Sequence, residues 1–315
     1  MMSEISKYLR LFTAVLATTP LVLALGCGKT EVVSVDGSST VFLVSAAVAE
    51  QFRDVNPKVN VVVSQSGTGG GFKKFAAGEI DVCDASREIT AEEAEACKQA
   101  GVDFEEFEIA FDGLAVLVNP GNDWCDVITV DQLKTIWRPE SENVVTSWRD
   151  VNPDWPDEEL KLYGPGTDSG TYDYFTEVIN GKTKSCRQDY SASENDNALV
   201  TGVAGDKGSL GYFGLGYYEE NKDKLKLLAV DAGERPVEPT AKTVRDGTYK
   251  PLSRPLFIYV RKASLGKPGV KEFVDYYLEK AGEVAPKVGY VAVTDEVAAE
   301  SREKFIAMSG APSSD

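Results

Sequence analysis

A turn rich in glycine and hydroxyl groups at residues 164–171 is the stretch of this sequence best suited to chemistry. It reads Gly-Pro-Gly-Thr-Asp-Ser-Gly-Thr and is followed by residues 172–180, whose pattern predicts a helix. The first turn of a helix has free backbone N–H groups at the positive end of the helix dipole, so it can hold an anion. The sequence therefore predicts an oxyanion site at the start of this helix.

Three more hydroxyl-bearing loops follow predicted strands near the N-terminus. The strands are expected at 31–35, 59–64 and 80–83, and the loops after them contain Thr40, Thr68 and Ser86. Each loop leads into a predicted helix, at 41–55, 72–77 and 90–100, the last beginning with a capping box. In open α/β sheets the carboxyl ends of the strands form the edge where ligands bind. Four neutral cradles suit one small tetrahedral anion.

Two similar apolar strands, at 114–118 and 256–260, predict how the chain is divided. The chain has 315 residues and 43% apolar content, which is enough for two domains. Between the two strands the sequence changes character, with four tryptophans and long polar connections, and predicted helices at 270–281 and 295–307 can pack back on the first domain. We expect an α/β chain with two crossovers that form a hinge, and a ligand cleft between the lobes. The expected lobes are 27–116 plus 257–315, and 117–256.

The composition excludes several classes of protein. The sequence contains no histidine, which removes Ser-His-Asp catalysis, His-assisted cysteine catalysis and most zinc hydrolases. A formal net charge of −17 argues against a nucleic-acid partner. The glycine run at 66–74 matches neither nucleotide-binding glycine motif, and its other interpretation is a tight turn between strand and helix. We expect no enzyme activity, no metal and no cofactor.

The first 26 residues have the features of a secretion signal. Two basic residues precede an uncharged run at 11–25, which is too short for a comfortable membrane span. The run ends at Cys27 in a sequence similar to the lipobox of bacterial lipoproteins, so we expect lipid attachment at Cys27. The alternative is an ordinary cleaved signal, with Cys27 free or paired.

Four other cysteines remain, an even number that favours disulfides in an exported protein. Cys125 and Cys186 both lie in polar, turn-like surroundings and are expected to pair, which leaves Cys83 with Cys97. The alternative for Cys83 is a small buried residue. A zinc site is not expected, because no two cysteines are close in the sequence.

Residues 37–42, 66–71, 84–87 and 166–171, taken together and in this order, resemble the phosphate-binding proteins of bacterial phosphate ABC transporters. The resemblance implies a two-lobed periplasmic-binding-protein fold of class II that closes over inorganic phosphate. It also implies an exported monomer in the periplasm or at the cell surface, held to the membrane by a lipid at Cys27. The expected protein partners are the permease subunits of the ABC transporter.

The same resemblance implies which residues contact the anion. Hydroxyl and backbone donors of the first lobe would come from the loops after the first two strands, and those of the second lobe from the turn at residues 164–171. The implied ligand residues are Ser39, Thr40, Thr68, Ser86, Ser169, Gly170 and Thr171.

Two positions depart from the family pattern. Pro165 stands where better-known members have an arginine, and Ser86 stands where they have an aspartate. Arg87 is therefore the expected cation, because a guanidinium suits two oxygens of a tetrahedral anion. The alternative is a surface arginine paired with Glu88 or Glu92.

The missing aspartate leaves the choice between phosphate and sulfate open. Phosphate carries a proton near neutral pH, so an acceptor in the site would favour it over sulfate. Asp84, Asp168 and Asp196 are the candidate acceptors, and helix capping is the other interpretation of Asp168. Three other functions remain as alternatives: a binding protein for sulfate or molybdate, a secreted phosphatase-like enzyme, and an adhesin or matrix protein of the same fold without a ligand.

Overall fold

A computed structural model describes residues 31–167 and 169–310 and shows an α/β fold built on one ten-stranded sheet. The strand order is β2-β1-β3-β12-β4-β8-β6-β7, and β9 and β13 also pair with β4. A separate three-stranded sheet has the order β11-β10-β5. The predicted signal sequence and the lipid site at Cys27 lie outside the described residues.

The first three strands and the helices that follow them agree with the predicted repeat. β1 (Glu31–Gly37) pairs in parallel with β2 (Val59–Ser64) and with β3 (Val82–Ala85), so the carboxyl ends of all three strands meet at one edge. The helices after them are α1 (Ser39–Val55), α2 (Thr68–Ala76) and α3 (Ala91–Gln99). The predicted capping box at the start of α3 is present, formed by Thr90 and Glu93.

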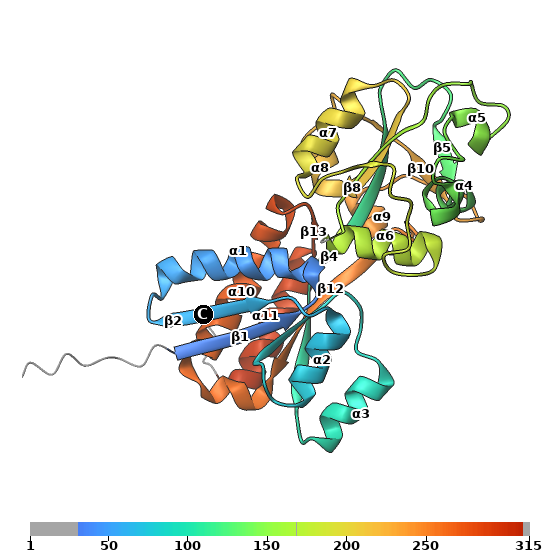
Figure 1. Ribbon diagram of the computed structural model, residues 1–315. Coiled ribbons are helices and arrows are strands. Elements are labelled where there is room, and N and C mark those ends of the chain that lie inside the picture. The colour runs from blue at the N-terminus through green and yellow to red at the C-terminus, as the bar shows by residue number, and fades with distance from the viewer. Residues whose placement is uncertain (1–30, 168, 311–315) are drawn as a thin grey trace, which may run out of the picture. The chain divides into compact units, whose positions relative to one another are not determined.

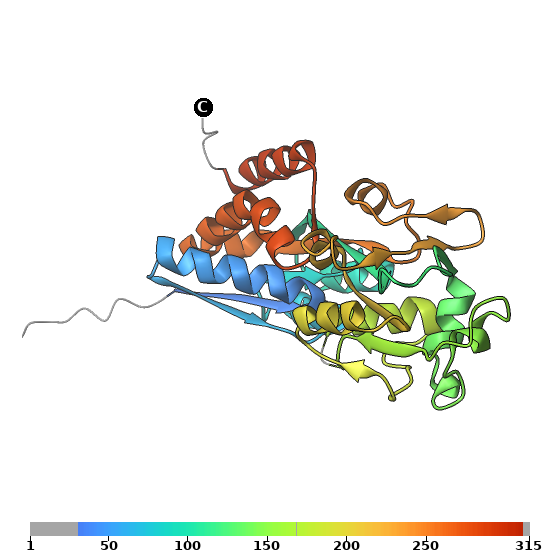
Figure 2. The same cartoon turned by 90° about the horizontal axis from the view of Figure 1, so that it is seen from above.

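Helices α1 and α10 (Pro268–Lys287) cover one face of β1 and β2, and Figure 2 shows these two helices side by side. The sheet residues beneath them are alternate valines such as Val33 and Val35, which are buried, as the period of a strand requires. Helix α11 (Asp295–Ser309) packs on α10 and on β4. Within the described ranges, no helix is both long enough and apolar enough to span a membrane.

β4 (Phe104–Val118) joins the strands of the N-terminal part of the sheet to those around β8, and β12 (Ser253–Arg261) is its neighbour on one side. β4 is much longer than the strand predicted at 114–118. Its first half was not predicted, because three glutamates stand among buried residues such as Phe107 and Ile109. This half pairs antiparallel with β12, and residues 114–118 pair with β8 (Ser209–Gly214). Figure 1 shows β12 beside β4, with α9 near the end of β12 that lies away from α10.

The buried residues form two large cores, and β4 contributes to both. The central core takes its members from 114–252 together with Val291, and the N-terminal core takes them from 33–110 and 256–305. The chain therefore changes core between Ala110 and Leu114 and again between Leu252 and Leu256. A smaller cluster under α2 contains Phe72 and Tyr259.

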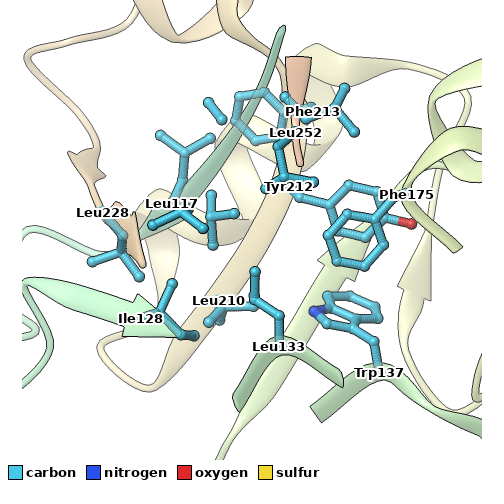
Figure 3. Packing of buried hydrophobic residues seen from close by; sticks show 14 of the residues in the cluster. Leu117, Ile128, Leu133, Trp137, Phe175, Leu210, Tyr212, Phe213, Leu228 and Leu252 are labelled. Carbon is cyan, nitrogen blue, oxygen red and sulfur yellow. The ribbon is translucent and has the colours of Figure 1, made fainter. Parts of the chain in front are cut away.

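Aromatic rings anchor α6 (Gly170–Asn180) in the central core. Phe175 of α6 stacks on Tyr212, with ring centroids 3.6 Å apart, and Trp137 meets Tyr212 edge-on at 4.9 Å (Figure 3). The other elements are β5 (Val127–Thr129), α4 (Val130–Trp137), α5 (Trp148–Val151), β6 (Lys161–Gly164), β7 (Ser191–Ala192), α7 (Asp196–Gly205), α8 (Leu215–Glu219), β9 (Lys226–Leu227), β10 (Ala229–Asp231), β11 (Pro236–Val237), α9 (Ala241–Arg245), β13 (Val291–Ala292), and two 3₁₀ turns at Pro139–Ser141 and Lys262–Gly266.

The expected disulfides are not formed. Cys83, Cys97, Cys125 and Cys186 are all buried free thiols, which corrects the predicted pairs Cys125–Cys186 and Cys83–Cys97. Each side chain instead fills space in a core, the first two in the cluster under α2 and the other two in the central core. Burial raises the pKa of Cys125 and of Cys186 to about 12, so both remain protonated thiols.

Candidate functional site

The loops after β1, β2 and β3 meet at a cavity of about 530 Å³. It is also lined by residues of α6 and by one residue of β12. Most of the predicted ligand residues lie on its wall: Ser39, Thr40, Thr68, Ser86, Arg87 and Gly170. Ser169 and Thr171 instead line a neighbouring cavity of about 280 Å³, which shares Ser39 and Gly170 with the first.

The start of α1 forms one wall of the larger cavity. Ser38 caps the helix, and its Oγ accepts hydrogen bonds from the N–H groups of Thr40, at 3.2 Å, and Val41, at 3.4 Å. The N–H of Ser38 itself donates to the carbonyl of Asp84 at 2.9 Å, which ties this turn to the end of β3. An anion in the cavity can replace Ser38 Oγ as the acceptor for these N–H groups.

Asp36 at the end of β1 positions the loop that precedes α2. Its carboxylate accepts from the N–H of Ser66, at 2.9 Å, and from Ser66 Oγ, at 2.8 Å, and it forms an ion pair with Lys74. Burial alone would raise the pKa of Asp36, but the bonds from Lys74 and Ser66 outweigh it and lower the pKa. A buried carboxylate thus holds Ser66, two residues before Thr68.

We expect Asp36→Asn to lower the free energy of unfolding by about 1–3 kcal/mol, because the new amide N–H₂ would face the Lys74 ammonium without an acceptor between them. Urea unfolding monitored by circular dichroism measures the change. Asp54→Asn is the matched control, since Asp54 is exposed on α1. Equal stability of the two variants would show that Asp36 does not hold the loop.

Thr68 and Ser86 come from different loops and are in contact. The N–H of Ser86 donates to Thr68 Oγ1 at 3.3 Å, and the two hydroxyl oxygens are 3.2 Å apart. Thr68 opens α2, while Ser86 follows β3 directly. Two predicted ligand residues are therefore adjacent on the same cavity wall.

Arg87 lines the cavity, but its guanidinium is already paired. Nη1 and Nη2 donate to the two carboxylate oxygens of Glu93, at 2.8 and 2.9 Å, and Nη1 also donates to the carbonyl of Glu88. The alternative interpretation was that Arg87 is a surface arginine paired with Glu88 or Glu92. The carboxylate that it meets is Glu93, the residue that closes the capping box of α3.

Helix α6 approaches α1 at Gly170. Ser169 caps α6, and its Oγ accepts from the N–H of Thr171 at 3.2 Å. A Cβ atom on Gly170 would lie 2.4 Å from Thr40 Oγ1 and 2.7 Å from the backbone nitrogen of Thr40. Only glycine therefore allows the two helix starts to come this close.

The sequence did not reveal Arg254, which β12 places on the cavity wall. Its Nη2 donates to Thr40 Oγ1 at 2.8 Å and to Asp112 Oδ2 at 3.1 Å, and its Nε donates to Asp112 Oδ2 at 3.2 Å. The guanidinium carbon lies 3.8 Å from the centroid of the Tyr174 ring. The only sequence signal was position, because Asp112 and Arg254 stand just outside the apolar runs that predicted the two crossovers.

Asp112 is fully buried beside Arg254. Its Oδ1 has no hydrogen-bond partner among the described residues. Burial raises the pKa of Asp112, although the charge and the hydrogen bonds of Arg254 act in the opposite direction. The two residues are cross-strand neighbours of β4 and β12, and each lies where the chain changes core.

The three candidate acceptors have different locations. Asp84 is fully buried and lines neither cavity; it accepts from Ser45 Oγ at 2.9 Å, and burial raises its pKa to about 8. Asp196 lines the smaller cavity, and burial raises its pKa to about 6. Asp168 lies outside the described residues. Across 31–167 and 169–310, no group of three or more His, Cys, Asp or Glu residues could hold a metal ion.

Comparison with known proteins identifies the family. Residues 27–281 match the model of the PBP superfamily domain. The chain belongs to this superfamily. It is 48% identical to Protein SphX of Synechococcus elongatus, over 87% of this chain and 81% of the relative, and 40% identical to Phosphate-binding protein PstS of Staphylococcus saprophyticus, over 89% and 86%.

A solved structure agrees with the fold. A possible phosphate binding protein from Planctomyces limnophilus is 49% identical, with a TM-score of 0.83 over 89% of this chain and 99% of that one. The predicted two-lobed periplasmic-binding-protein fold is thereby confirmed.

Proposed function

We propose that the protein captures inorganic phosphate outside the cytoplasm and delivers it to the permease of an ABC transporter. The observation that carries this proposal is the convergence of hydroxyl and N–H donors from three strand-to-helix loops and α6 on neighbouring cavities that share Ser39 and Gly170. The relatives support the choice of ligand, since one of them is named a phosphate-binding protein and a solved structure is described as a possible one.

Binding would use donors from both helix starts. Phosphate would accept hydrogen bonds from the N–H groups at the start of α1, in place of Ser38 Oγ. It would also accept hydrogen bonds from the N–H groups at the start of α6, in place of Ser169 Oγ. Hydrogen bonds to a charged ligand strengthen as water is excluded from the cavity. The proposed ligand residues are Ser39, Thr40, Thr68, Ser86, Arg87, Ser169, Gly170 and Thr171.

The lobes are proposed as 27–116 plus 257–315, and 117–256, with the cavity between them. The change of core between Ala110 and Leu114 and between Leu252 and Leu256 supports a hinge a few residues before each proposed boundary. Closure about these two crossings would bring α6 onto α1 around the anion.

Isothermal titration calorimetry tests the ligand. We expect phosphate to bind more tightly than sulfate or molybdate, and tighter binding of sulfate would refute the proposal. We also propose Asp196 as the acceptor of the phosphate proton, because it is the candidate that lines a cavity among the described residues. Asp196→Asn should then reduce the preference for phosphate over sulfate by at least about tenfold, and an unchanged preference would remove Asp196 from this role.

The remaining parts of the proposal concern the form of the protein. It would act as a binding protein without catalytic activity, and release of product from an aryl phosphate by the purified protein would show otherwise. It would be a monomer, which light scattering can measure. A lipid at Cys27 would anchor it to the membrane, and Cys27→Ser should release it into the soluble fraction.

A further inference from the structure

Arg254 occupies a position that connects both lobes. Its strand partner is Asp112, and the two residues lie where the chain passes from one core to the other, between Ala110 and Leu114 and between Leu252 and Leu256. From there the guanidinium reaches Thr40 at the start of α1 and the ring of Tyr174 on α6. A charge at this point is close to both helix starts that carry the proposed donors.

The hydrogen bonds of Arg254 leave one side of its guanidinium available. Of the nitrogens that carry its five N–H donors, Nε and Nη2 are bound to Asp112 and Thr40. Nη1 donates to nothing within the described residues, while the side chain lines the cavity. An oxyanion in the cavity can therefore accept from Nη1 without breaking an existing bond.

Neighbouring groups fix the plane of this guanidinium. The Tyr174 ring packs against one face at 3.8 Å, and the Tyr174 hydroxyl donates to the carbonyl of Pro251 at 2.6 Å, which holds the ring in place. Asp112 holds the edge of the guanidinium that carries Nε and Nη2, on the side away from Nη1. The Arg254 side chain is therefore already ordered before the anion binds, so binding does not carry the entropic cost of ordering it.

The bond from Arg254 also orients the hydroxyl group of Thr40. Thr40 Oγ1 uses a lone pair to accept from Nη2 at 2.8 Å, so its hydrogen remains available for another acceptor. Thr40 is itself buried at the cavity wall. One arginine thereby supplies a charge and aligns a neutral donor.

Arg87 is the weaker candidate for the same task. Both arginines are paired with a carboxylate, but both terminal nitrogens of Arg87 are bound to Glu93, whereas Nη1 of Arg254 has no partner among the described residues. The Arg87 side chain is 43% exposed, against 16% for Arg254, so water screens its interaction with an anion more strongly.

We infer that Arg254, rather than Arg87, is the main cation of the anion site, and that Asp112 is the residue that positions it. This inference rests on the proposed phosphate-binding function.

Calorimetry with phosphate on lysine substitutions tests the inference. We expect Arg254→Lys to weaken binding at least about tenfold, since lysine keeps the charge but lacks the second N–H group that bridges Asp112 and the anion. Arg87→Lys should weaken binding less. Lys73→Ala, an exposed position on α2, should leave binding unchanged. A loss below tenfold for Arg254→Lys, or a larger loss for Arg87→Lys, would overturn the inference.

The positioning role of Asp112 is tested by a double-mutant cycle. Asp112→Asn should weaken phosphate binding in the wild-type background but have no further effect in Arg254→Lys, because it acts through Arg254. Losses that multiply would show that Asp112 acts independently. Thermal unfolding without phosphate shows whether Asp112→Asn folds. If it does not, Tyr174→Phe, which removes only the hydroxyl group, replaces Asp112→Asn in the cycle with the same expectation. If the wild-type protein itself binds no phosphate, the proposed function fails, whereas this inference fails only when wild-type binding is present.

Discussion

Gly170→Ala is expected to weaken phosphate binding by about 100-fold or more, the largest single effect that we foresee. The added methyl group would lie 2.4 Å from Thr40 Oγ1 and 2.7 Å from the Thr40 nitrogen, so α6 could not reach its present position against α1. Phosphate would then lose the donors of one helix start. Each hydrogen bond to a charged group contributes about 1.5–3 kcal/mol, and two of them account for the expected loss.

Calorimetry with phosphate measures the effect, and Gly205→Ala is the matched control. Gly205 is the exposed last residue of α7, and a Cβ atom there would meet nothing within 4 Å. Thermal unfolding without phosphate shows whether Gly170→Ala folds with both cores intact, since the clash lies between the starts of α1 and α6 and not within a core. Wild-type affinity in Gly170→Ala would mean that phosphate binding does not need the contact between α1 and α6.

The second large effect concerns Asp84, whose substitution by asparagine should stabilise the protein more as pH rises. Asp84 is fully buried, and burial raises its pKa from 3.8 to about 8. In the unfolded chain the carboxyl group ionises near pH 4, whereas in the folded protein it keeps its proton until about pH 8. The wild type therefore loses stability across this interval and stays at the lower level above it.

Asparagine stays neutral and keeps an oxygen that can accept from Ser45 Oγ. The free energy of unfolding of Asp84→Asn minus that of the wild type should be larger at pH 9 than at pH 5 by at least about 2 kcal/mol, since one pKa unit corresponds to about 1.4 kcal/mol. Urea titrations at both pH values measure it. Using the difference between pH values removes any constant cost of the buried amide, and a difference of zero would show that Asp84 is ionised in the folded protein.

Local patterns in the sequence were sufficient for the first half of the site. The predicted strand at 59–64 is β2, and the loops with Thr40, Thr68 and Ser86 do follow parallel strands and do line one cavity. These features depend on neighbouring residues alone: alternating valines define the strands, and glycine and hydroxyl residues define the turns. The capping box of α3 is equally local.

Features that depend on distant pairing were not predictable in this way. The first half of β4 alternates between glutamates and buried residues, and it is a strand because it pairs with β12, which lies about 150 residues later. The same pairing brings Asp112 to Arg254, so neither residue shows its role in its own stretch of sequence. The disulfide prediction relied on the even number of cysteines and on the expected export of the protein. The four thiols are instead free and packed inside the cores.

The nesting of the two cores has a consequence for the order of folding. The central core draws almost all of its residues from one continuous stretch, 114–252, whereas the N-terminal core must join segments on either side of it. Closing a long disordered loop costs entropy. Once the central stretch has folded, the N–H of Leu114 bonds to the carbonyl of Leu252 at 2.9 Å, so the ends of β4 and β12 are already adjacent. We therefore expect pairing to proceed residue by residue from Gly113 and Ser253 outward, and the N-terminal core to form after the central core.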